Sequence, residues 1–402
     1  MKPDRPILLC IWNYYRADIT EFLLKLDDHF ELVFLNDYEP SDKKGCIKEC
    51  KRIFWSEYTS PYQILDELKV SQILFSDVES FHQTALVIAA RNRKIKSFVL
   101  EHGLRGDFEI DLQIQLYYQR KNKKLLSENT NEVDSSLLQN QSFKTLKFYL
   151  SSIRLQNFGS ILWILIFIFY RKKYGLTYGL YKLKKKFRWA DTYLNFTELN
   201  ATYIQARDGV PKDRFRMTGN ASFDGFFQMA MHFTPSVSVR YLLLIDSPFV
   251  EAAIFGMTPL KKNEFIIKLN DFAISKGLKL YIKLHPLSFN SDYYFKNANI
   301  IYYKNHDINI LILESAACVY MHLSSLMPLG ILYKPFLFFN TYPAYNPYIL
   351  SMDIKAFDFY NFEIAELVFS ELDEKNKKLI IDRFLFSTDG QAIKRIENYL
   401  VQ

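Results

Sequence analysis

The sequence has little of what marks secreted or disulfide-stabilised proteins. It contains four cysteines in 402 residues. Cys10 and Cys318 lie in apolar runs and are predicted to be buried thiols. Cys46 and Cys50 lie close together in a lysine-rich stretch, but no second Cys or His pair nearby completes a zinc site. The amino terminus also lacks a long apolar segment with a small-residue cleavage site, so we expect a cytoplasmic protein.

A hydrophobic run long enough to cross a bilayer is missing as well. The apolar run Ile161 to Tyr170 is too short to span a hydrocarbon core of roughly 30 Å as a helix. A basic, tyrosine-rich stretch follows, and this pairing is typical of a helix that lies in the interface of an anionic inner membrane. A buried core helix with a solvated basic face fits the same pattern. The residues expected at the membrane are Trp163, Phe167, Arg171, Lys172, Lys173, Lys184, Lys185 and Lys186. No nucleic-acid-binding motif accompanies them, so no nucleic acid partner is expected.

The composition is that of a large folded protein with more than one core. Hydrophobic residues make up 49% and aromatic residues 16% of the chain, and 402 residues exceed what one core usually supports. Strand-like runs alternate with helical stretches in both halves, as in parallel sheets with helical crossovers. We therefore expect an α/β protein with a first domain at 1–205, a second at 206–385 and a terminal helix in 386–402 that packs back on the first domain. The first domain would include a helical insertion at about 140–190.

Two motifs in the second half lie where polar groups meet at a sheet edge. In Tyr281-Ile-Lys-Leu-His-Pro286, an apolar run predicts a buried strand that delivers His285 to its carboxyl end before proline stops it. In Ala317 to Tyr333, a second short strand leads to Ser324 and Ser325 at the predicted start of a helix. An imidazole and two hydroxyls placed in this way can hold a phosphate. An ordinary strand end and an ordinary helix cap are the alternative.

A third strand run, Tyr241-Leu-Leu-Leu-Ile-Asp-Ser-Pro248, precedes these motifs and is followed by Glu251. Together the three segments resemble the carboxy-terminal half of bacterial sialyltransferases, including lipooligosaccharide sialyltransferases and capsule polysialyltransferases. Related patterns occur in Kdo transferases and CDP-glycerol polymerases. The resemblance implies a GT-B fold, in which two Rossmann-like domains face a cleft and the second domain holds most of a cytidine nucleotide.

The resemblance also implies roles for single residues. His285 would contact or protonate the phosphate that leaves, and the serine pair would bind it. Gly219 and Asn220 resemble a segment that opens the second domain in several GT-B enzymes, although a simple interdomain turn is the alternative. The nucleotide-binding residues expected in this way are Lys283, His285, Pro286, Ser324, Ser325, Gly219 and Asn220. His322, on the strand before the serine pair, is expected to support the phosphate site or to pack in the core.

The first half offers the matching acceptor side. A strand run from Ser97 ends in Glu101-His102-Gly103, where glycine allows a tight turn. The sialyltransferases that this chain resembles carry two acidic residues and a glycine here, one acid being the general base, so the histidine is a departure. Glu101 is the preferred base, His102 the second candidate and Asp107 the third. Asn13, after the strand run Ile7 to Trp12, is also expected on the acceptor side.

These features predict an inverting glycosyltransferase that moves an acidic sugar, sialic acid by preference, from a CMP-sugar to a bacterial surface glycan or glycolipid. No Asp-x-Asp motif follows a strand to chelate a diphosphate through a metal, so we expect no metal and no cofactor. A Kdo transferase or a CDP-polyol phosphotransferase is the alternative within the same superfamily. A nucleotide-sugar epimerase or hydrolase, or a non-catalytic membrane-bound partner in glycan assembly, is the alternative of another class.

Overall fold

The protein folds into two compact units. The first comprises Met1–Asp224 together with Gln391–Gln402, and the second comprises Gly225–Gly390. The coordinates are a computed structural model. They describe residues 5–15, 20–36, 50–101, 103–114, 116, 146–153, 159–234, 240–252, 254–322, 324–341 and 354–402.

A seven-stranded parallel sheet forms the centre of the first unit, in the order β3-β2-β1-β4-β5-β6-β7. Its strands are β1 (Ile7–Ile11), β2 (Glu31–Asn36), β3 (Lys51–Phe54), β4 (Val70–Phe75), β5 (Lys96–Leu100), β6 (Thr192–Asn195) and β7 (Phe215–Met217). Successive strands run outward from β1 in one direction and from β4 in the other. The sheet therefore has a topological switch point between β1 and β4, as in a Rossmann-like domain.

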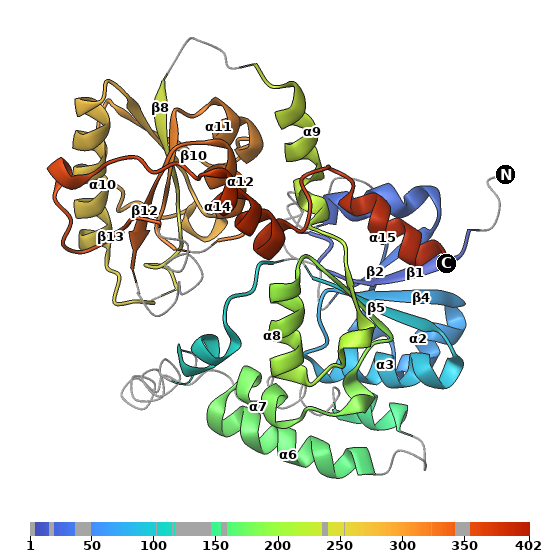
Figure 1. The fold of residues 1–402 in the computed structure, drawn as a ribbon. Helices are drawn as coiled ribbons and strands as arrows, with labels where there is room; N and C mark the ends of the chain where they lie inside the picture. Colours follow the sequence, from blue (N-terminus) through green and yellow to red (C-terminus); the bar gives the residue numbers. More distant parts are fainter. Residues whose placement is uncertain are drawn as a thin grey trace. The chain divides into compact units, whose positions relative to one another are not determined.

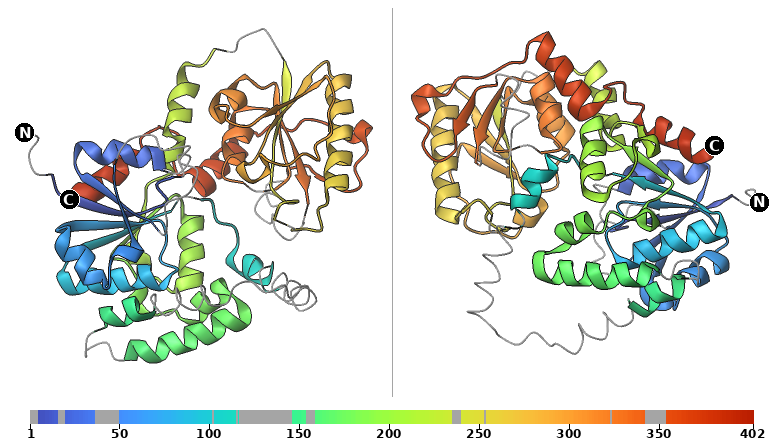
Figure 2. Two further views of the ribbon diagram at one scale, coloured as in Figure 1. Left: turned by 180° about the vertical axis from the view of Figure 1, so that it is seen from behind. Right: turned by 60° about the horizontal axis from the view of Figure 1, so that its bottom comes forward.

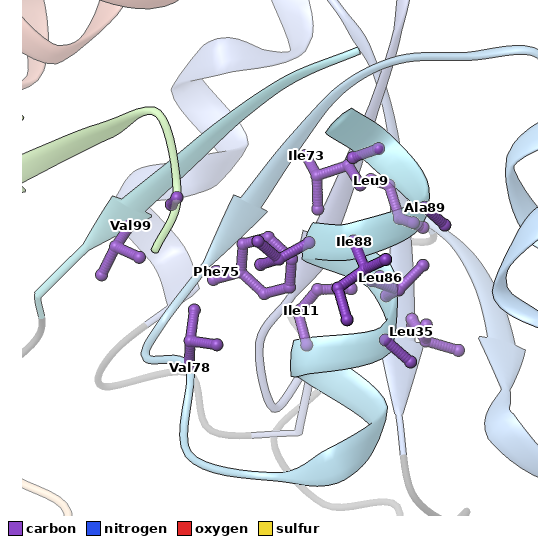
Figure 3. Close-up of a cluster of buried hydrophobic side chains, with 14 of the residues drawn as sticks. Leu9, Ile11, Leu35, Ile73, Phe75, Val78, Leu86, Ile88, Ala89 and Val99 are labelled. Carbon is purple, nitrogen blue, oxygen red and sulfur yellow. The ribbon is translucent and has the colours of Figure 1, made fainter. Parts of the chain in front are cut away.

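Helices cover both faces of this sheet because its strands are apolar on both sides. The helices of this unit are η1 (Glu21–Asp28), α2 (Pro61–Glu67), α3 (Phe81–Arg93), α6 (Gly159–Tyr174), α7 (Leu176–Lys182), α8 (Glu198–Asp208) and α15 (Ala392–Val401). On one face, Ile11, Phe75 and Val99 pack against α3 through Leu86 and neighbouring side chains (Figure 3). On the other face, the core includes residues of η1 and α15.

The second unit is built around a six-stranded parallel sheet in the order β10-β9-β8-β11-β12-β13. Its strands are β8 (Tyr241–Ile245), β9 (Lys279–Lys283), β10 (Ile300–Tyr303), β11 (Ala317–Tyr320), β12 (Phe336–Asn340) and β13 (Ala356–Asp358). The helix α10 (Pro259–Ser275) covers one face, and α11 (Ile308–Glu314), α12 (Met327–Tyr333) and α14 (Glu374–Ile380) lie on the other (Figure 1). Its switch point lies between β8 and β11.

The last helix, α15, belongs to the first unit although the whole second unit precedes it in the chain. Ala392, Ile396 and Leu400 are buried in the core on the η1 face. The carboxylate of Asp224, at the start of α9 (Asp224–His232), accepts hydrogen bonds from the backbone N–H groups of Ala392 at 2.9 Å and Ile393 at 2.8 Å. Two orphan donors at the start of α15 are thereby satisfied.

The apolar run after Gly159 forms α6, which packs side by side with α7 (Figures 1 and 2). One prediction for this run is wrong. Phe167, expected at a membrane, is only 2% exposed and packs with Leu180, Leu183 and Phe81. The backbone of Trp163 lies in α6, and its side chain is outside the described residues. None of the helices in the described ranges combines the length and apolar character needed to cross a bilayer.

Most strand predictions from apolar runs are confirmed, and the differences lie in the connections. The terminal helix predicted in 386–402 begins only at Ala392. It is preceded by a π-helical turn at Ile381–Leu385 and by Phe386, which has a φ of +67°. The segment between His285 and Ala317, for which no element was predicted, contains β10 and α11. Cys10 and Cys318 are buried thiols, as predicted, and Cys46 lies outside the described residues.

Ile396→Ala should lower the free energy of unfolding of the first unit by about 2–5 kcal/mol, because a buried isoleucine leaves a cavity against the η1 face. Lys394→Ala, on the exposed side of the same helix, is the matched control and should change it by less than about 0.5 kcal/mol. Urea denaturation followed by circular dichroism measures both. Equal stability of the two variants would mean that α15 contributes nothing to this core.

Candidate functional site

Polar side chains of the second unit gather where β8, β9 and β11 end. Asp246 and Ser247 follow β8, His285 follows β9, and His322 follows β11. Because the three strands are parallel neighbours, their carboxyl ends lie at one edge of the sheet, beside the switch point. We call these four residues and Ser324 the β8-β9-β11 cluster.

The ring of His285 is held by the turn that follows it. His285 is the N-cap of a short 3-10 turn, Pro286–Ser288, and its Nδ1 accepts a hydrogen bond from the backbone N–H of Leu287 at 3.2 Å. An accepting Nδ1 places the proton of the neutral ring on Nε2. The backbone N–H of His285 also faces Oδ2 of Asp246, at 3.4 Å. The strand end thus presents an imidazole whose Nε2–H is a hydrogen-bond donor.

The ring of His322 lies in the same cluster. Its Nδ1 is 3.0 Å from the hydroxyl oxygen of Ser247. Burial, and next the proximity of His285, lower the pKa of His322 to about 4. At neutral pH His322 is therefore uncharged. Of the two roles expected for it, support of the polar site is the one that its contact with Ser247 favours.

The serine pair differs from expectation in one respect. The helix α12 begins only at Met327, and its N-cap residue, Leu326, makes no side-chain cap. The serine hydroxyls therefore do not cap it, although the carbonyl of Ser324 accepts from the N–H of Met327 at 3.1 Å. The Oγ of Ser324 is buried and has no hydrogen-bond partner among the described residues. A buried hydroxyl without a protein partner costs free energy unless a ligand or water satisfies it.

A buried ion pair between Lys262 and Asp246 stabilises the β8-β9-β11 cluster. Nζ of Lys262, on α10, lies 2.7 Å from Oδ1 of Asp246, and the two side chains are 2% and 0% exposed. Lys262 also donates to the carbonyl of Ser247 and to the hydroxyl of Tyr294, both at 3.1 Å. This lysine was not among the residues expected from the sequence. Its spacing was a usable signal, because Lys262 precedes the buried Phe265, Ile266 and Leu269 at helical intervals.

Lys283 is placed differently from the rest of the predicted phosphate site. Its ammonium group donates to the carbonyl of Lys304, at the end of the neighbouring strand β10, and lies 5.6 Å from the ring of Phe289. Its backbone carbonyl accepts from the N–H of Asp246 at 3.0 Å, so Lys283 meets the β8-β9-β11 cluster through its backbone, while its ammonium group is bonded on the β10 side.

In the first unit, Glu101 follows β5 and is 1% exposed. Its Oε1 accepts from Nε of Arg105 at 3.1 Å, and its Oε2 accepts from the amides of Asn195, at 3.1 Å, and Asn200. Burial raises the pKa of Glu101, against the opposing effects of Arg105 and Asn200. In this arrangement the carboxylate joins the ends of β5 and β6 to α8. For Glu101 to act as the base, an acceptor hydroxyl must displace one of these donors.

Arg105 links Glu101 to a second buried group of charges. Its Nη2 is 3.1 Å from Oδ2 of Asp77, which follows β4. Arg207, on α8 and 2% exposed, pairs with Asp77, Glu79 and Asp208 at 2.7 Å each. Although burial opposes it, the charges of Arg207 and Arg105 lower the pKa of Asp77. The carboxyl ends of β4 and β5 are therefore joined by alternating carboxylates and guanidinium groups.

The other predicted acceptor-side residues lie nearby in sequence or at the end of β1. His102 falls outside the described residues. Asp107 caps the helical turn after it, since its Oδ1 accepts from the N–H groups of Glu109 at 2.9 Å and Ile110 at 3.1 Å. Asn13 is exposed at the end of β1, where its Oδ1 accepts from the N–H of Tyr15.

Gly219 and Asn220 belong to the first unit. Gly219 has a φ of +77°, in the left-handed region that glycine adopts without strain. The Oδ1 of Asn220 caps a short turn by accepting from the N–H of Ser222 at 3.0 Å. The same segment ends in Asp224, which holds α15. The contacts seen for Gly219 and Asn220 are thus structural, and a nucleotide contact stays a prediction.

Comparison with known proteins adds information on the fold. No protein-family model matches the sequence, and no curated protein matches it. Two solved structures of a variant of the wall teichoic acid polymerase TagF, one after a 30-minute soak with CDPG, align with 100% of this chain at TM-scores of 0.52 and 0.51. The two TagF structures share 12% and 13% sequence identity with this chain, and the alignments cover 88% and 89% of their own length. The UDP-GlcNAc 2-epimerase from Methanocaldococcus jannaschii aligns over 99% of both chains with 10% identity and a TM-score of 0.46.

At these identities the likeness shows the fold. Two parallel α/β units with the topology described above, aligned over the full chain with TagF, make this a GT-B protein. The predicted fold class is confirmed. The sialyltransferase type named by the sequence motifs is a finer statement that the fold alone does not carry.

Lys262→Met should lower the free energy of unfolding of the second unit by about 3–5 kcal/mol, because it leaves Asp246 buried without its counter-charge. Lys261→Met, next to it on α10 and exposed, is the matched control and should cost less than about 1 kcal/mol. Urea denaturation of both variants measures the difference. If the two variants are equally stable, the buried pair does not support this edge of the sheet.

His322 should make the stability of the second unit depend on pH. Its pKa lies near 4 in the folded protein and near its ordinary value of about 6.5 in the unfolded chain, so the unfolded chain binds the proton more strongly. Stability should therefore be intact above about pH 6.5 and fall by about 2 kcal/mol at about pH 5. His322→Gln should remove this part of the pH dependence in thermal unfolding, whereas His306→Gln, which alters an exposed ring, should not. Identical pH profiles of the wild type and His322→Gln would contradict this.

Proposed function

We propose that this protein is a metal-independent, inverting glycosyltransferase that takes an acidic sugar, sialic acid by preference, from a CMP-sugar and transfers it to a bacterial surface glycan or glycolipid. The observation that carries the proposal is the β8-β9-β11 cluster. An Nε2–H donor at His285, the hydroxyl of Ser324, which has no hydrogen-bond partner among the described residues, and the Ser247–His322 pair follow neighbouring strands beside the switch point of the second sheet. Ligands of open α/β sheets bind at this place.

The charges of the cluster favour a leaving group with a single phosphate. The ammonium of Lys262 is neutralised by Asp246 at 2.7 Å, and His322 is uncharged at neutral pH. The hydrogen-bond donors that remain in the cluster are uncharged. Uncharged donors suit a monophosphate better than a diphosphate, because the larger negative charge of a diphosphate needs more positive charge to neutralise it. His285 would donate a hydrogen bond from its Nε2–H to a phosphate oxygen as the bond to the sugar breaks, and Ser324 would hold the same phosphate.

On the acceptor side, a base must take the proton of the attacking hydroxyl while the sugar develops oxocarbenium character. Glu101 and His102 stay the candidates for this role. If Glu101 is the base, Arg105 and Asn200 must give up hydrogen bonds to its carboxylate so that the acceptor hydroxyl can bind there. If His102 acts, Glu101 and its three donors would hold the turn that carries the histidine.

A CDP-polyol phosphotransferase is the second candidate. It is favoured by the two TagF structures, which share the fold over the whole chain and include one soaked with CDPG. Both candidates require a cytidine nucleotide at the cluster, and both release CMP as the leaving group. They differ in the group transferred, which is the sugar in one case and the polyol phosphate in the other.

Titration with CMP, CDP and UDP in the presence of EDTA tests the proposal by calorimetry. CMP should bind the wild type, and His285→Ala should weaken this binding about tenfold or more because a charge-assisted hydrogen bond is lost. His306→Ala, an exposed histidine of the same unit, is the control and should bind as the wild type. Preferential binding of UDP, or no nucleotide binding at all, would overturn the assignment.

Turnover tests the chemical role separately. With CMP-sialic acid, CMP-Kdo and CDP-glycerol offered in turn to a mixture of acceptor glycans, the donor consumed identifies the class of transfer. His285→Ala should reduce turnover by a factor on the order of 10² or more. Consumption of a UDP-sugar without an acceptor would identify an epimerase or hydrolase instead.

A further inference from the structure

The helix α6 turns a row of large apolar side chains to solvent. Leu162 and Leu165 are each 60% exposed, Phe169 is 56% exposed and Ile168 is 38% exposed. Their spacing of three and four residues places them on one side of the helix. Lys172 and Lys173 are exposed and continue the same side by one further turn. We call these six residues the α6 face.

The orientation of this face is fixed by packing on the opposite side. Phe167 is buried against Leu180 and Leu183 of the α7 region. A Cβ at Gly179 would lie 3.0 Å from the ring of Phe167 and 3.3 Å from the backbone nitrogen of Arg171, so glycine is what lets α7 approach so closely. With Phe167 locked inward, α6 cannot rotate to bury the α6 face on its own unit.

The surroundings of the α6 face are positively charged. No Asp or Glu occurs from Ser135 to Ala190, whereas eleven Lys or Arg residues do. Since the whole chain carries a formal charge of +7, the rest of the sequence is net negative, at −4. The positive charge of this protein is therefore concentrated in the segment that contains α6 and α7.

We propose that the α6 face is a docking surface for an anionic phospholipid bilayer. Apolar side chains beside lysines are the combination that inserts at the level of lipid headgroups while ammonium groups meet phosphates. Lys172 and Lys173 stand one turn beyond Phe169, close enough for the Nζ of Lys173 to lie 5.7 Å from its ring. A second copy of the chain fits less well, because symmetric pairing of this face would bring two strongly basic segments together.

This inference is independent of the nucleotide site and refines the membrane prediction made from sequence. Phe167 is replaced as a contact by Leu162, Leu165, Ile168 and Phe169. Of the basic residues predicted, Lys172 and Lys173 lie on the exposed apolar side itself. The helix would lie along the bilayer surface, because its 16 residues are fewer than a crossing requires.

Sedimentation with vesicles tests the proposal on the full-length chain. Vesicles of equal parts phosphatidylglycerol and phosphatidylcholine should bind the wild type, and pure phosphatidylcholine should bind it on the order of tenfold less. Raising the salt from about 0.1 to about 0.5 M should weaken binding to the anionic vesicles. Leu165→Ser combined with Phe169→Ser should reduce that binding about tenfold or more, since two apolar anchors are lost.

Matched variants separate this surface from general stickiness. Leu260→Ser with Ile274→Ser removes two apolar side chains of α10 that are 69% and 53% exposed, and should leave vesicle binding unchanged. Lys172→Ser with Lys173→Ser should weaken binding about tenfold, whereas Lys375→Ser with Lys378→Ser, on the exposed side of α14, should not. Unchanged thermal midpoints and circular dichroism spectra confirm that each variant is folded.

Three outcomes would overturn the proposal. The first is the absence of binding to anionic vesicles by the wild type. The second is equal binding to neutral vesicles that the lysine changes do not affect. The third is self-association, seen by analytical ultracentrifugation without lipid, that disappears in Leu165→Ser with Phe169→Ser, because the occupant of the α6 face would then be another copy of this chain.

Discussion

Parallel pairing of the strands is the constraint on which both candidate sites depend. Among the described residues, the strands of each sheet all run parallel to one another. The carboxyl ends of the strands therefore lie along one edge of each sheet. Polar residues that are far apart in sequence, such as Ser247, His285 and His322, become neighbours for this reason alone. The buried helical cover on both faces leaves that edge as the place where unpaired polar groups can meet a ligand.

Burying polar and charged groups at such an edge costs free energy. Both units offset this cost with ion pairs. In the second unit a single ion pair, Asp246 with Lys262, holds the strand end that carries the histidine contact. In the first unit, Asp77, Arg105 and Arg207 form a larger network that ends at Glu101. These charges are stable only as sets, because removing one member leaves another buried without its partner.

The sequence predicted the strands best where an apolar run ended in a polar turn, as at Tyr241 to Ser247 and at His285. The sequence did not predict which side of a helix is buried where the helix is apolar on every side. The run around Phe167 is apolar on every side, so nothing in it distinguished the side that packs on Leu180 from the side that faces solvent. The side chain of Lys283 donates to the carbonyl of Lys304, after another strand, and a partner so placed is not visible in the sequence alone. Two partners of Glu101, Asn195 and Asn200, come from a different strand and helix, and one sequence without tertiary contacts cannot reveal them.

The position of α15 has a consequence for synthesis on the ribosome. Ile396 and Leu400 complete the core that Leu8 and Phe34 begin, yet the whole second unit is translated before them. While the second unit is being made, the η1 face of the first sheet lacks this cover and exposes apolar side chains. The first unit can therefore reach its final stability only after the second unit and α15 have been translated, and a chain that lacks α15 would keep that face open to chaperones and proteases.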